Sequence, residues 1–352
     1  AQGTFRDIGG GVSYMNQRGQ LNWGGSLSHT PLIFSANTVP FRNDAGRLVG
    51  LGSVVQRAYI TSASGNASYP LSPTRRFEFS LGGTRYGFGT NVRTAGLAPD
   101  GAEQALQNQF GDRTPKYLAT ASAAYVRDFT TNGLTGPLQG GRWRLEVSPT
   151  LGSQNFVTAR ADVRRYFYAE PFTFAFQALH VGNYGASFND EFGIGNEYIG
   201  YPYGQGFVRG YSVQSIANGI RENGGCTRVD NAPTTSPCAE IDRLFGTRAL
   251  TTRAEIRIPL LGPERLSLIP FRYLPTTLAP FVDAGVTWTN DAGPDLFTFD
   301  TDSADTTIPV VSAGVSARFN ILGSLLLEAY YARPFQRRDT TWELGFRISP
   351  GF

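Results

Sequence analysis

The sequence is poor in several residue types on which common classes of protein depend. Its 352 residues include two histidines, two cysteines and one methionine, and Lys116 is the single lysine. Charged residues make up 17% of the chain, against about 25% in ordinary globular proteins. The net charge of +3 is too small to indicate a nucleic-acid-binding surface. We therefore expect no nucleic-acid partner.

The residues that catalytic and metal sites need are also scarce. His29 and His180 lie outside the G-x-S-x-G and H-E-x-x-H contexts of hydrolases and metalloproteases. The glycine-rich stretches GQGFVRG and GIGNEYIG lack the strand-to-helix setting of a nucleotide-binding loop. The acidic segment 291–305 lacks the glycine and the distal glutamate of an EF-hand. We expect no enzyme activity, no cofactor and no metal site.

Long hydrophobic runs are missing as well, and period-two alternation takes their place. No run of about 18 apolar residues occurs, so we expect no transmembrane helix. In the final stretch, TTWELGFRISPGF, one face of the expected strand carries Trp342, Leu344, Phe346, Ile348 and Phe352. The residues between them are mostly polar or glycine, as in a strand with one apolar and one polar face.

About thirteen segments of the chain alternate in this way: near 5–15, 19–29, 48–63, 75–88, 115–129, 141–151, 155–169, 171–183, 247–260, 276–289, 308–319, 323–333 and 339–352. Most are longer than the five or six residues typical of strands in a soluble β-sandwich, which is the alternative fold. Strands of about 9–11 residues or more with apolar outer faces are typical of membrane barrels. In lipid every backbone group must be paired, so the sheet must close. The sequence therefore predicts an all-β fold, a transmembrane antiparallel β-barrel forming one domain over residues 1–352.

The number of segments is odd, whereas single-chain bacterial barrels have even numbers of strands. One explanation is that alternation does not reveal every strand, with Leu32–Val39 and Leu266–Leu274 as candidates. The other is that the chain lacks its first strands and a periplasmic domain before Ala1. We expect 16 strands in the complete barrel. Short turns alternate with long loops at 30–47, 89–114, 184–246 and 290–307. The chain begins without a signal peptide, as a processed chain or a fragment would.

Alternation also predicts the direction of side chains near the longest loop. The residues expected to face lipid are Leu250, Ala254, Ile256 and Ile258 in one strand, and Leu278, Val282, Ala284, Val286 and Trp288 in the next. Side chains alternate between the two faces of a strand. The residues expected to face the lumen are therefore Arg253, Glu255, Arg257, Phe281, Asp283 and Gly285.

The loop 184–246 carries the stretch FVRGY, and loops of this length usually have a function. We expect this loop to fold into the lumen, where Arg209 pairs with Asp283, with Glu255 or with both. The guanidinium offers five donors in a fork that matches carboxylates. Gly210 would allow a close backbone approach or a positive φ. Two bulky neighbours would pack beside Phe281 and Gly285, namely Phe207 and Tyr211. In the alternative interpretation, Arg209 is a solvated loop residue.

Both cysteines lie in the same loop. Cys226 and Cys238 are about a dozen residues apart. An oxidising compartment outside the cytoplasm favours a disulfide between them.

These motifs together carry a family resemblance. VRGY lies in the loop five strands before the C-terminus and resembles the signature of the outer-membrane assembly-factor and transporter superfamily, which includes BamA, TamA and the two-partner secretion transporters. Tyr211 stands where phenylalanine is also common. The strands TRAEIRIPL and APFVDAGVTW are similar to family patterns, as is Arg127-Asp128 followed by Gly140-Gly141-Arg142. Several stretches are most similar to the C-terminal barrels of periplasmic WD-repeat-like propeller proteins: FRDIGGGVSYMNQRGQLNWG, GRWRLEVSPTLGS, RRYFYAEPFTFAFQALH and ARPFQRR.

The resemblance implies a location in the bacterial outer membrane and a role in membrane-protein insertion or polypeptide translocation. It implies contacts with lipid and lipopolysaccharide, with the barrel assembly machinery during biogenesis, and with periplasmic or other membrane proteins. It also implies a C-terminal assembly signal at Trp342, Phe346, Ile348 and Phe352. The sequence contains no POTRA repeats and no propeller. The alternative is therefore a non-catalytic anchor or scaffold barrel for a periplasmic propeller or a partner complex.

Overall fold

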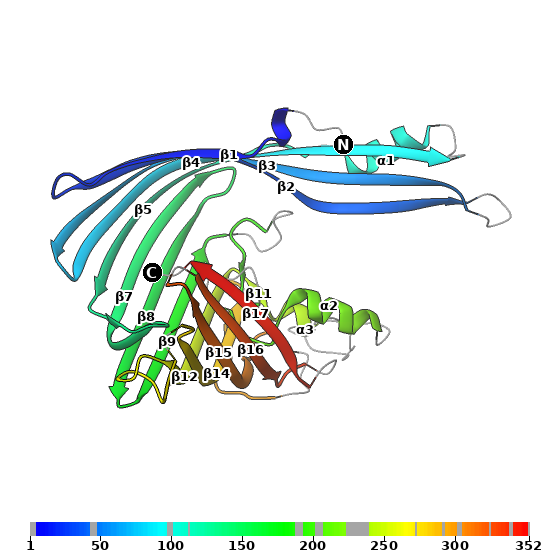
Figure 1. The fold of residues 1–352 in the computed structure, drawn as a ribbon. Coiled ribbons are helices and arrows are strands. Elements are labelled where there is room, and N and C mark those ends of the chain that lie inside the picture. The colour runs from blue at the N-terminus through cyan, green and yellow to red at the C-terminus, as the bar shows by residue number, and fades with distance from the viewer. Residues whose placement is uncertain are drawn as a thin grey trace. The chain divides into compact units, whose positions relative to one another are not determined.

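The computed structural model (Figure 1) consists mainly of one antiparallel β-sheet of 15 strands. It describes residues 5–42, 48–96, 101–111, 113–186, 193–200, 207–222, 239–271, 273–290, 293–300, 305–323, 325–337 and 341–350. Within these residues, no helix has both the length and the apolar character needed to cross a membrane.

The elements follow one another in a simple order. The strands are β1 Gly10–Asn16, β2 Asn22–Arg42, β3 Leu48–Ser72, β4 Arg75–Gly96, β5 Lys116–Asp128, β6 Thr131–Asn132, β7 Pro137–Gly152, β8 Phe156–Ala169, β9 Phe172–Tyr184, β10 Glu197–Tyr198, β11 Phe245–Gly246, β12 Arg248–Gly262, β13 Ile269–Pro270, β14 Thr276–Trp288, β15 Val310–Ile321, β16 Leu325–Pro334 and β17 Glu343–Pro350. The helical segments are a 3-10 turn at Phe5–Asp7, α1 Ala102–Phe110, α2 Val213–Glu222 and α3 Ala239–Asp242.

Thirteen long strands form the continuous path of the sheet in chain order, β1-β2-β3-β4-β5-β7-β8-β9-β12-β14-β15-β16-β17. Each of the thirteen segments expected from the sequence falls on one of them. The two-residue strands β6 and β13 pair beside the path, and β10 pairs with β11 in a separate small sheet. The all-β antiparallel class predicted from alternation is confirmed.

Two of the expected loops are wrong, because strands continue through them. The segment 30–47 contains the end of β2, so the candidate strand Leu32–Val39 is part of an element already counted. Pro31 and Pro40 lie within this part of β2, and both are in register with β3, opposite Tyr59 and Leu51. Antiparallel ladders contain pairs that need no N–H donor, and such positions tolerate proline. The segment 89–114 contains the end of β4 and helix α1, and the candidate Leu266–Leu274 contributes only β13.

The chain divides into two compact units. The first comprises Ala1–Pro70, Phe77–Ala123 and Pro149–Asn155, and the second comprises Leu71–Arg76, Ala124–Ser148 and Phe156–Phe352. The single-domain organisation expected from the sequence stays a prediction.

The first unit has a hydroxyl-lined face and an apolar face. Pairs of serines hydrogen-bond across neighbouring strands on the hydroxyl-lined face: Ser26 with Ser64, Ser28 with Ser62, and Ser80 with Ser122. Large apolar side chains alternate with them and are exposed, among them Trp23, Leu27, Phe79 and Leu81. Helix α1 contributes Leu106 to a small buried cluster with Val54 and Val92.

The second unit reverses the arrangement of a soluble protein. Its exposed large apolar residues include Trp143, Leu145, Val147, Val163, Phe167, Phe176, Ile256, Val282, Val315, Tyr331, Leu344, Phe346 and Ile348. Its buried polar residues include Asp162, Thr173, Glu255, Asp283, Ser312, Ser316, Arg318 and Glu328. Soluble proteins bury the first kind and expose the second, so the sheet has an apolar outer face. One expected outer residue differs: Val286 is 2% exposed, between Leu250 and the neighbouring strand β15.

Candidate functional site

The candidate site is the part of the loop between β9 and β12 that lies against the polar face of the second unit. Backbone hydrogen bonds fix this segment. The Ile199 amide donates to the Leu244 carbonyl at 3.1 Å, and the Val208 amide donates to the Ile199 carbonyl at 2.8 Å. These bonds continue from the β10–β11 pair and bring residues 207–211 to the sheet. Gly210 then turns the chain with a φ of +88°, a conformation that favours glycine.

Arg209 is fully buried, with 0% of its surface exposed. Its guanidinium forms a bidentate pair with Asp283, with Nε–Oδ2 and Nη2–Oδ1 distances of 2.7 Å each. It also lies 3.0 Å from Glu255 Oε1 and 3.1 Å from Glu328 Oε1. The Arg209 amide donates to Asp283 Oδ2 at 3.2 Å. One loop arginine therefore meets carboxylates from β12, β14 and β16.

An aromatic ring covers one face of this guanidinium. The Cζ atom of Arg209 lies 3.4 Å from the centroid of the Phe281 ring. Stacking of this kind places the cation over the negative face of the ring. Burial alone would lower the pKa of Arg209, but the attraction of Asp283 and Glu255 outweighs it and the pKa is raised. Arg209 therefore stays charged.

Three arginines of the sheet share the same carboxylates. Arg253 Nε lies 3.2 Å from Asp283 Oδ1, and Arg257 Nε lies 3.1 Å from Glu255 Oε2. Arg318 Nη2 bridges Glu255 at 2.7 Å and Glu328 at 3.1 Å. Each of the three carboxylates thus contacts at least two guanidinium groups. We call these seven residues the latch network: Arg209, Arg253, Glu255, Arg257, Asp283, Arg318 and Glu328.

Tyr211 anchors the loop on the other side of the turn at Gly210. Its ring is fully buried in an apolar cluster with Ile199, Val208, Ile216, Leu244, Ala249 and Val310. Its hydroxyl lies 2.8 Å from Gln336 Oε1 and accepts a hydrogen bond from the Gln336 amide at 3.0 Å. Burial raises the pKa of Tyr211, so the phenol stays neutral and can donate.

A further arginine binds the loop backbone at the same turn. Arg337 Nη1 donates to the Gly210 carbonyl at 3.0 Å, and Arg337 Nη2 donates to Ser215 Oγ at 3.1 Å. Its charge is balanced by Glu343, which it contacts directly. Arg337 follows β16 and Glu343 begins β17, so the last strands of the chain also hold the loop.

The structure brings eight of the residues proposed from the sequence into one place: Phe207, Arg209, Gly210, Tyr211, Glu255, Phe281, Asp283 and Gly285. The Phe207 carbonyl accepts from Arg253 Nη2 at 2.9 Å, and the Phe207 ring lies 5.2 Å from the Arg253 guanidinium. Gly285 lies beneath Val208 rather than beneath Tyr211. A Cβ atom at Gly285 would come within 2.7 Å of Val208 Cγ2. The glycine therefore permits the close approach of the loop.

The other proposed residues lie elsewhere. Trp342 stacks on Tyr331 of β16 with ring centroids 4.7 Å apart, while Phe346 and Ile348 of β17 are 66% and 60% exposed. They belong to the apolar outer face. Phe352, Cys226 and Cys238 lie outside the described residues, so the C-terminal signal and the disulfide stay predictions.

Sequence reasoning missed four residues of the site, Arg318, Glu328, Gln336 and Arg337. One signal was available for Glu328, which is the single acid in the mostly apolar strand LLLEAYYARP. Period two places it on the same face as Tyr330 and Ala332, both of which are buried. No comparable signal marks Gln336 or Arg337, because both lie in the turn after β16.

Chemically, the site is a closed set of charge pairs and hydrogen bonds that fixes the loop to the wall. Arg209 is the member that comes from the loop, whereas the other six residues of the latch network come from strands. Separating the loop from the wall therefore means withdrawing this one side chain from three carboxylates. The arrangement is suited to holding or releasing a segment rather than to covalent chemistry.

Comparison with known proteins identifies the fold but not a close relative. No family model and no curated protein sequence matches the chain. Among solved structures, BamA from Haemophilus ducreyi lacking POTRA domains 1–3 matches with a TM-score of 0.56 and 15% identity, over 97% of this chain and 69% of that one. CdiB from Acinetobacter baumannii matches with a TM-score of 0.53 and 14% identity, over 96% of this chain and 49% of that one.

CdiB from Escherichia coli matches with a TM-score of 0.53 and 10% identity, over 97% of this chain and 52% of that one. The chain thus spans about half the length of these two CdiB chains. At such low identities the similarity concerns the fold alone. The chain has the antiparallel transmembrane β-barrel fold shared by BamA and CdiB.

Proposed function

We propose that this chain is an outer-membrane barrel of Gram-negative bacteria that takes part in inserting membrane proteins or in moving polypeptides across the membrane. The loop 184–246 acts as its movable plug. This role involves no enzymatic step. The proposed partners are outer-membrane lipid and lipopolysaccharide, the barrel assembly machinery, and periplasmic or membrane proteins. The observation that carries the proposal is the burial of Arg209, a loop residue, among three carboxylates of the wall.

A buried ion pair contributes little net free energy to folding stability. Desolvation of the charges offsets most of their attraction, and well-packed apolar residues of similar volume often stabilise a protein as much or more. A contact made of charges differs from an apolar contact in the free energy of the released state. Arg209 and the carboxylates can each be solvated in a polar interior, whereas an exposed apolar contact would remain unfavourable. Such a network supports a plug that must occupy one position and also leave it.

A fixed anchor for a periplasmic propeller or a partner complex is the alternative. The complete burial of Tyr211 and its hydrogen bonds to Gln336 favour this alternative, because they suit a loop that never moves. The two functions differ in whether release of the loop matters for activity.

A disulfide tether tests the proposal directly. Gly285 and Val208 are direct neighbours across the contact between loop and wall, since a Cβ at residue 285 would lie 2.7 Å from Val208 Cγ2, so cysteines at these two positions would tether the loop. The protein carrying Val208→Cys and Gly285→Cys is reconstituted in liposomes, and the folding rate of an unfolded outer-membrane protein is followed by protease protection. We expect the wild-type protein to accelerate folding over empty liposomes. We expect the oxidised tether to abolish this acceleration and a reductant to restore it.

Two controls make the result specific. The single variant Val208→Cys has no partner at position 285 and should behave like the wild type. The wild-type protein with and without reductant shows any effect of Cys226 and Cys238. Folding no faster than in empty liposomes would count against insertion, and acceleration that survives the oxidised tether would count against the plug.

A further inference from the structure

The apolar face of the first unit contains a groove of about 840 Å³ that the latch network does not involve. Its floor is formed by residues with little or no side chain, including Gly83, Ala63 and Ala119. Larger apolar residues flank it, and among them Leu27 and Leu151 are 59% and 62% exposed. The groove is therefore a depression in an apolar surface, open along one side.

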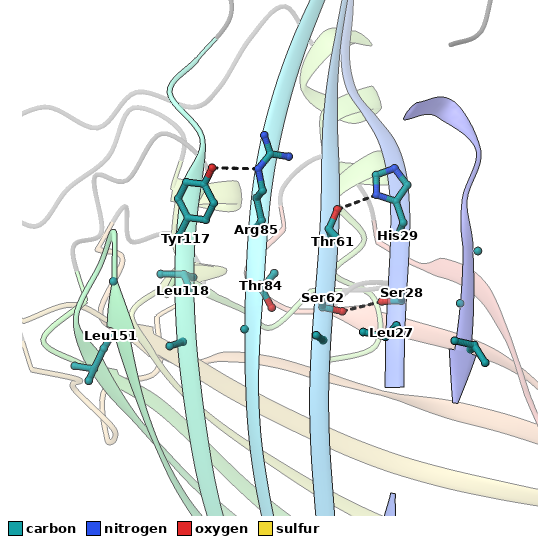
Figure 2. Close-up of a pocket in the computed structure, with 17 residues that line it drawn as sticks. Leu27, Ser28, His29, Thr61, Ser62, Thr84, Arg85, Tyr117, Leu118 and Leu151 are labelled. Carbon is teal, nitrogen blue, oxygen red and sulfur yellow. Dashed lines mark hydrogen bonds between the residues drawn. The ribbon is translucent and has the colours of Figure 1, made fainter. Parts of the chain in front are cut away.

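Polar side chains cross four neighbouring strands at one end of this groove. Figure 2 shows Tyr117, Arg85, Thr61 and His29 side by side, with Leu27 and Leu151 further along the strands. His29 Nδ1 lies 2.8 Å from Thr61 Oγ1, and Arg85 Nε donates to the Tyr117 hydroxyl at 3.3 Å. We call these four residues the polar row.

The polar row marks one end of an apolar band on β4, the end toward the C-terminus of the strand. On the outer face of this strand, Phe77, Phe79 and Leu81 are all exposed, and Gly83 and then Arg85 follow at the same spacing of two. Eight residues of strand rise by about 26 Å, close to the height of about 25 Å expected for the apolar band of a membrane barrel. Arg85 therefore lies where hydrocarbon gives way to headgroups.

Arg85 carries the positive charge at this end of the groove. Among the described residues, no carboxylate forms an ion pair with Arg85. Asp7 is connected to the polar row through Tyr59: it accepts a hydrogen bond from the Tyr59 hydroxyl at 3.1 Å and lies 3.7 Å from Arg57 Nε. Tyr59 in turn stacks on His29. With Arg57 balancing Asp7, the end of the groove carries an excess of positive charge.

We propose that this groove binds a membrane phospholipid with an anionic headgroup. Its acyl chain lies along Gly83, Ala63 and Ala119, and its phosphate meets Arg85, with the Tyr117 hydroxyl as a further hydrogen-bond donor. His29 borders the site without contacting the phosphate, because its ring nitrogens already bond to Thr61 Oγ1 at 2.8 Å and to the Arg6 carbonyl at 2.9 Å. The inference rests on the proposed function only in requiring that this face meets lipid. Guanidinium groups suit phosphate because their donors form a fork, and an apolar groove beneath a cation matches an amphiphile rather than a free ion.

Lipid binding to the delipidated full chain in detergent provides the test. Native mass spectrometry during titration with phosphatidylglycerol gives the dissociation constant, and phosphatidylcholine and inorganic phosphate serve as comparison ligands. We expect one tightly bound phosphatidylglycerol. Arg85→Gln should weaken its binding about fivefold, because a basic residue near a membrane surface contributes about 1 kcal/mol. Gly83→Leu should weaken it about tenfold or more by filling the groove.

Gly83→Leu is a suitable variant because a Cβ at this position meets nothing closer than the Leu118 carbonyl at 4.0 Å. Arg18→Gln, in the turn between β1 and β2, is the matched control and should leave binding unchanged. Equal binding of phosphatidylcholine, competition by inorganic phosphate alone, or unchanged binding in both groove variants would overturn the proposal. No folding client is present in this experiment. The lipid-binding proposal can therefore be refuted while the proposed function stands, and the reverse is also possible.

Discussion

Replacing Arg209 with alanine should release the loop while leaving the sheet folded. The substitution removes the bidentate pair with Asp283 and the contacts with Glu255 and Glu328. Breaking a buried pair by removing one partner costs about 3–5 kcal/mol. Each remaining carboxylate keeps one neighbouring arginine or more, so the lower value of about 3 kcal/mol applies here. The population of the released loop should therefore rise about a hundredfold.

Amide hydrogen exchange measures this change where it occurs. The Val208 amide donates to the Ile199 carbonyl only while the loop is docked, so its protection factor reports release. We expect protection at Val208 to fall about a hundredfold. Protection in β14 should change little, because ladder hydrogen bonds to β12 and β15 hold that strand on both sides.

Two further variants make the result interpretable. Arg164→Ala removes an arginine that pairs with Asp162 on the same sheet face and touches no loop residue of the latch network. Loop protection should stay unchanged in that variant. Arg209→Lys keeps the charge but loses the fork, so it should give an intermediate effect. Unchanged protection in Arg209→Ala, or an equal loss in Arg164→Ala, would refute the assignment of the latch.

Three other predictions concern the same loop. Gly285→Ala places a Cβ 2.7 Å from Val208 Cγ2 and should destabilise loop docking by about 1–3 kcal/mol, seen as faster exchange at Val208. Tyr211→Phe leaves the buried Gln336 amide without its acceptor, while Gln336 Oε1 keeps the Val311 amide, and should lower the free energy of unfolding by about 1–3 kcal/mol in thermal unfolding. Burial raises the pKa of Glu197, so the docked loop holds its proton more tightly than the released loop does. Docking should therefore weaken as pH rises above about 4, where ordinary glutamates titrate, with loop protection as the readout.

Each of these has a simple control. Gly83→Ala adds the same methyl group to a strand in open space and should be neutral. Tyr331→Phe removes a hydroxyl from the outer face, where the ring is half exposed. Glu197→Gln should abolish the pH dependence, and a dependence that persists in this variant would assign it to another group.

The strands were predictable from the sequence because alternation is a local property. A strand with one apolar face shows period two within a few residues, so β12 and β14 could be read together with the inward direction of Glu255 and Asp283. Arg209 could be suggested as their partner because guanidinium is the natural counterpart of a carboxylate. The loop is also close to both carboxylates in the chain, because it leads directly into the first of these two strands.

Features that depend on distant pairing were not predictable. Period two could orient Glu328, but nothing in the sequence indicates that β16 lies close enough to Arg209 for contact. The same is true of Arg337, whose contact with the Gly210 carbonyl joins residues 127 positions apart. The segment 30–47 was wrongly expected to be a loop for a similar reason, because pairing with β3 maintains the strand there although the sequence alternates poorly.

The sharing of carboxylates in the latch network has a consequence for how the loop moves. Glu255 contacts Arg209, Arg257 and Arg318, and Glu328 contacts both Arg209 and Arg318. Rotating one of these side chains away leaves its partners held by the others, so small fluctuations are reversed before the loop departs. We therefore expect undocking to behave as a single activated event with few half-open forms. In the proposed role as a plug, the loop would then be either docked or released, and its rate of undocking would set how often a passage opens.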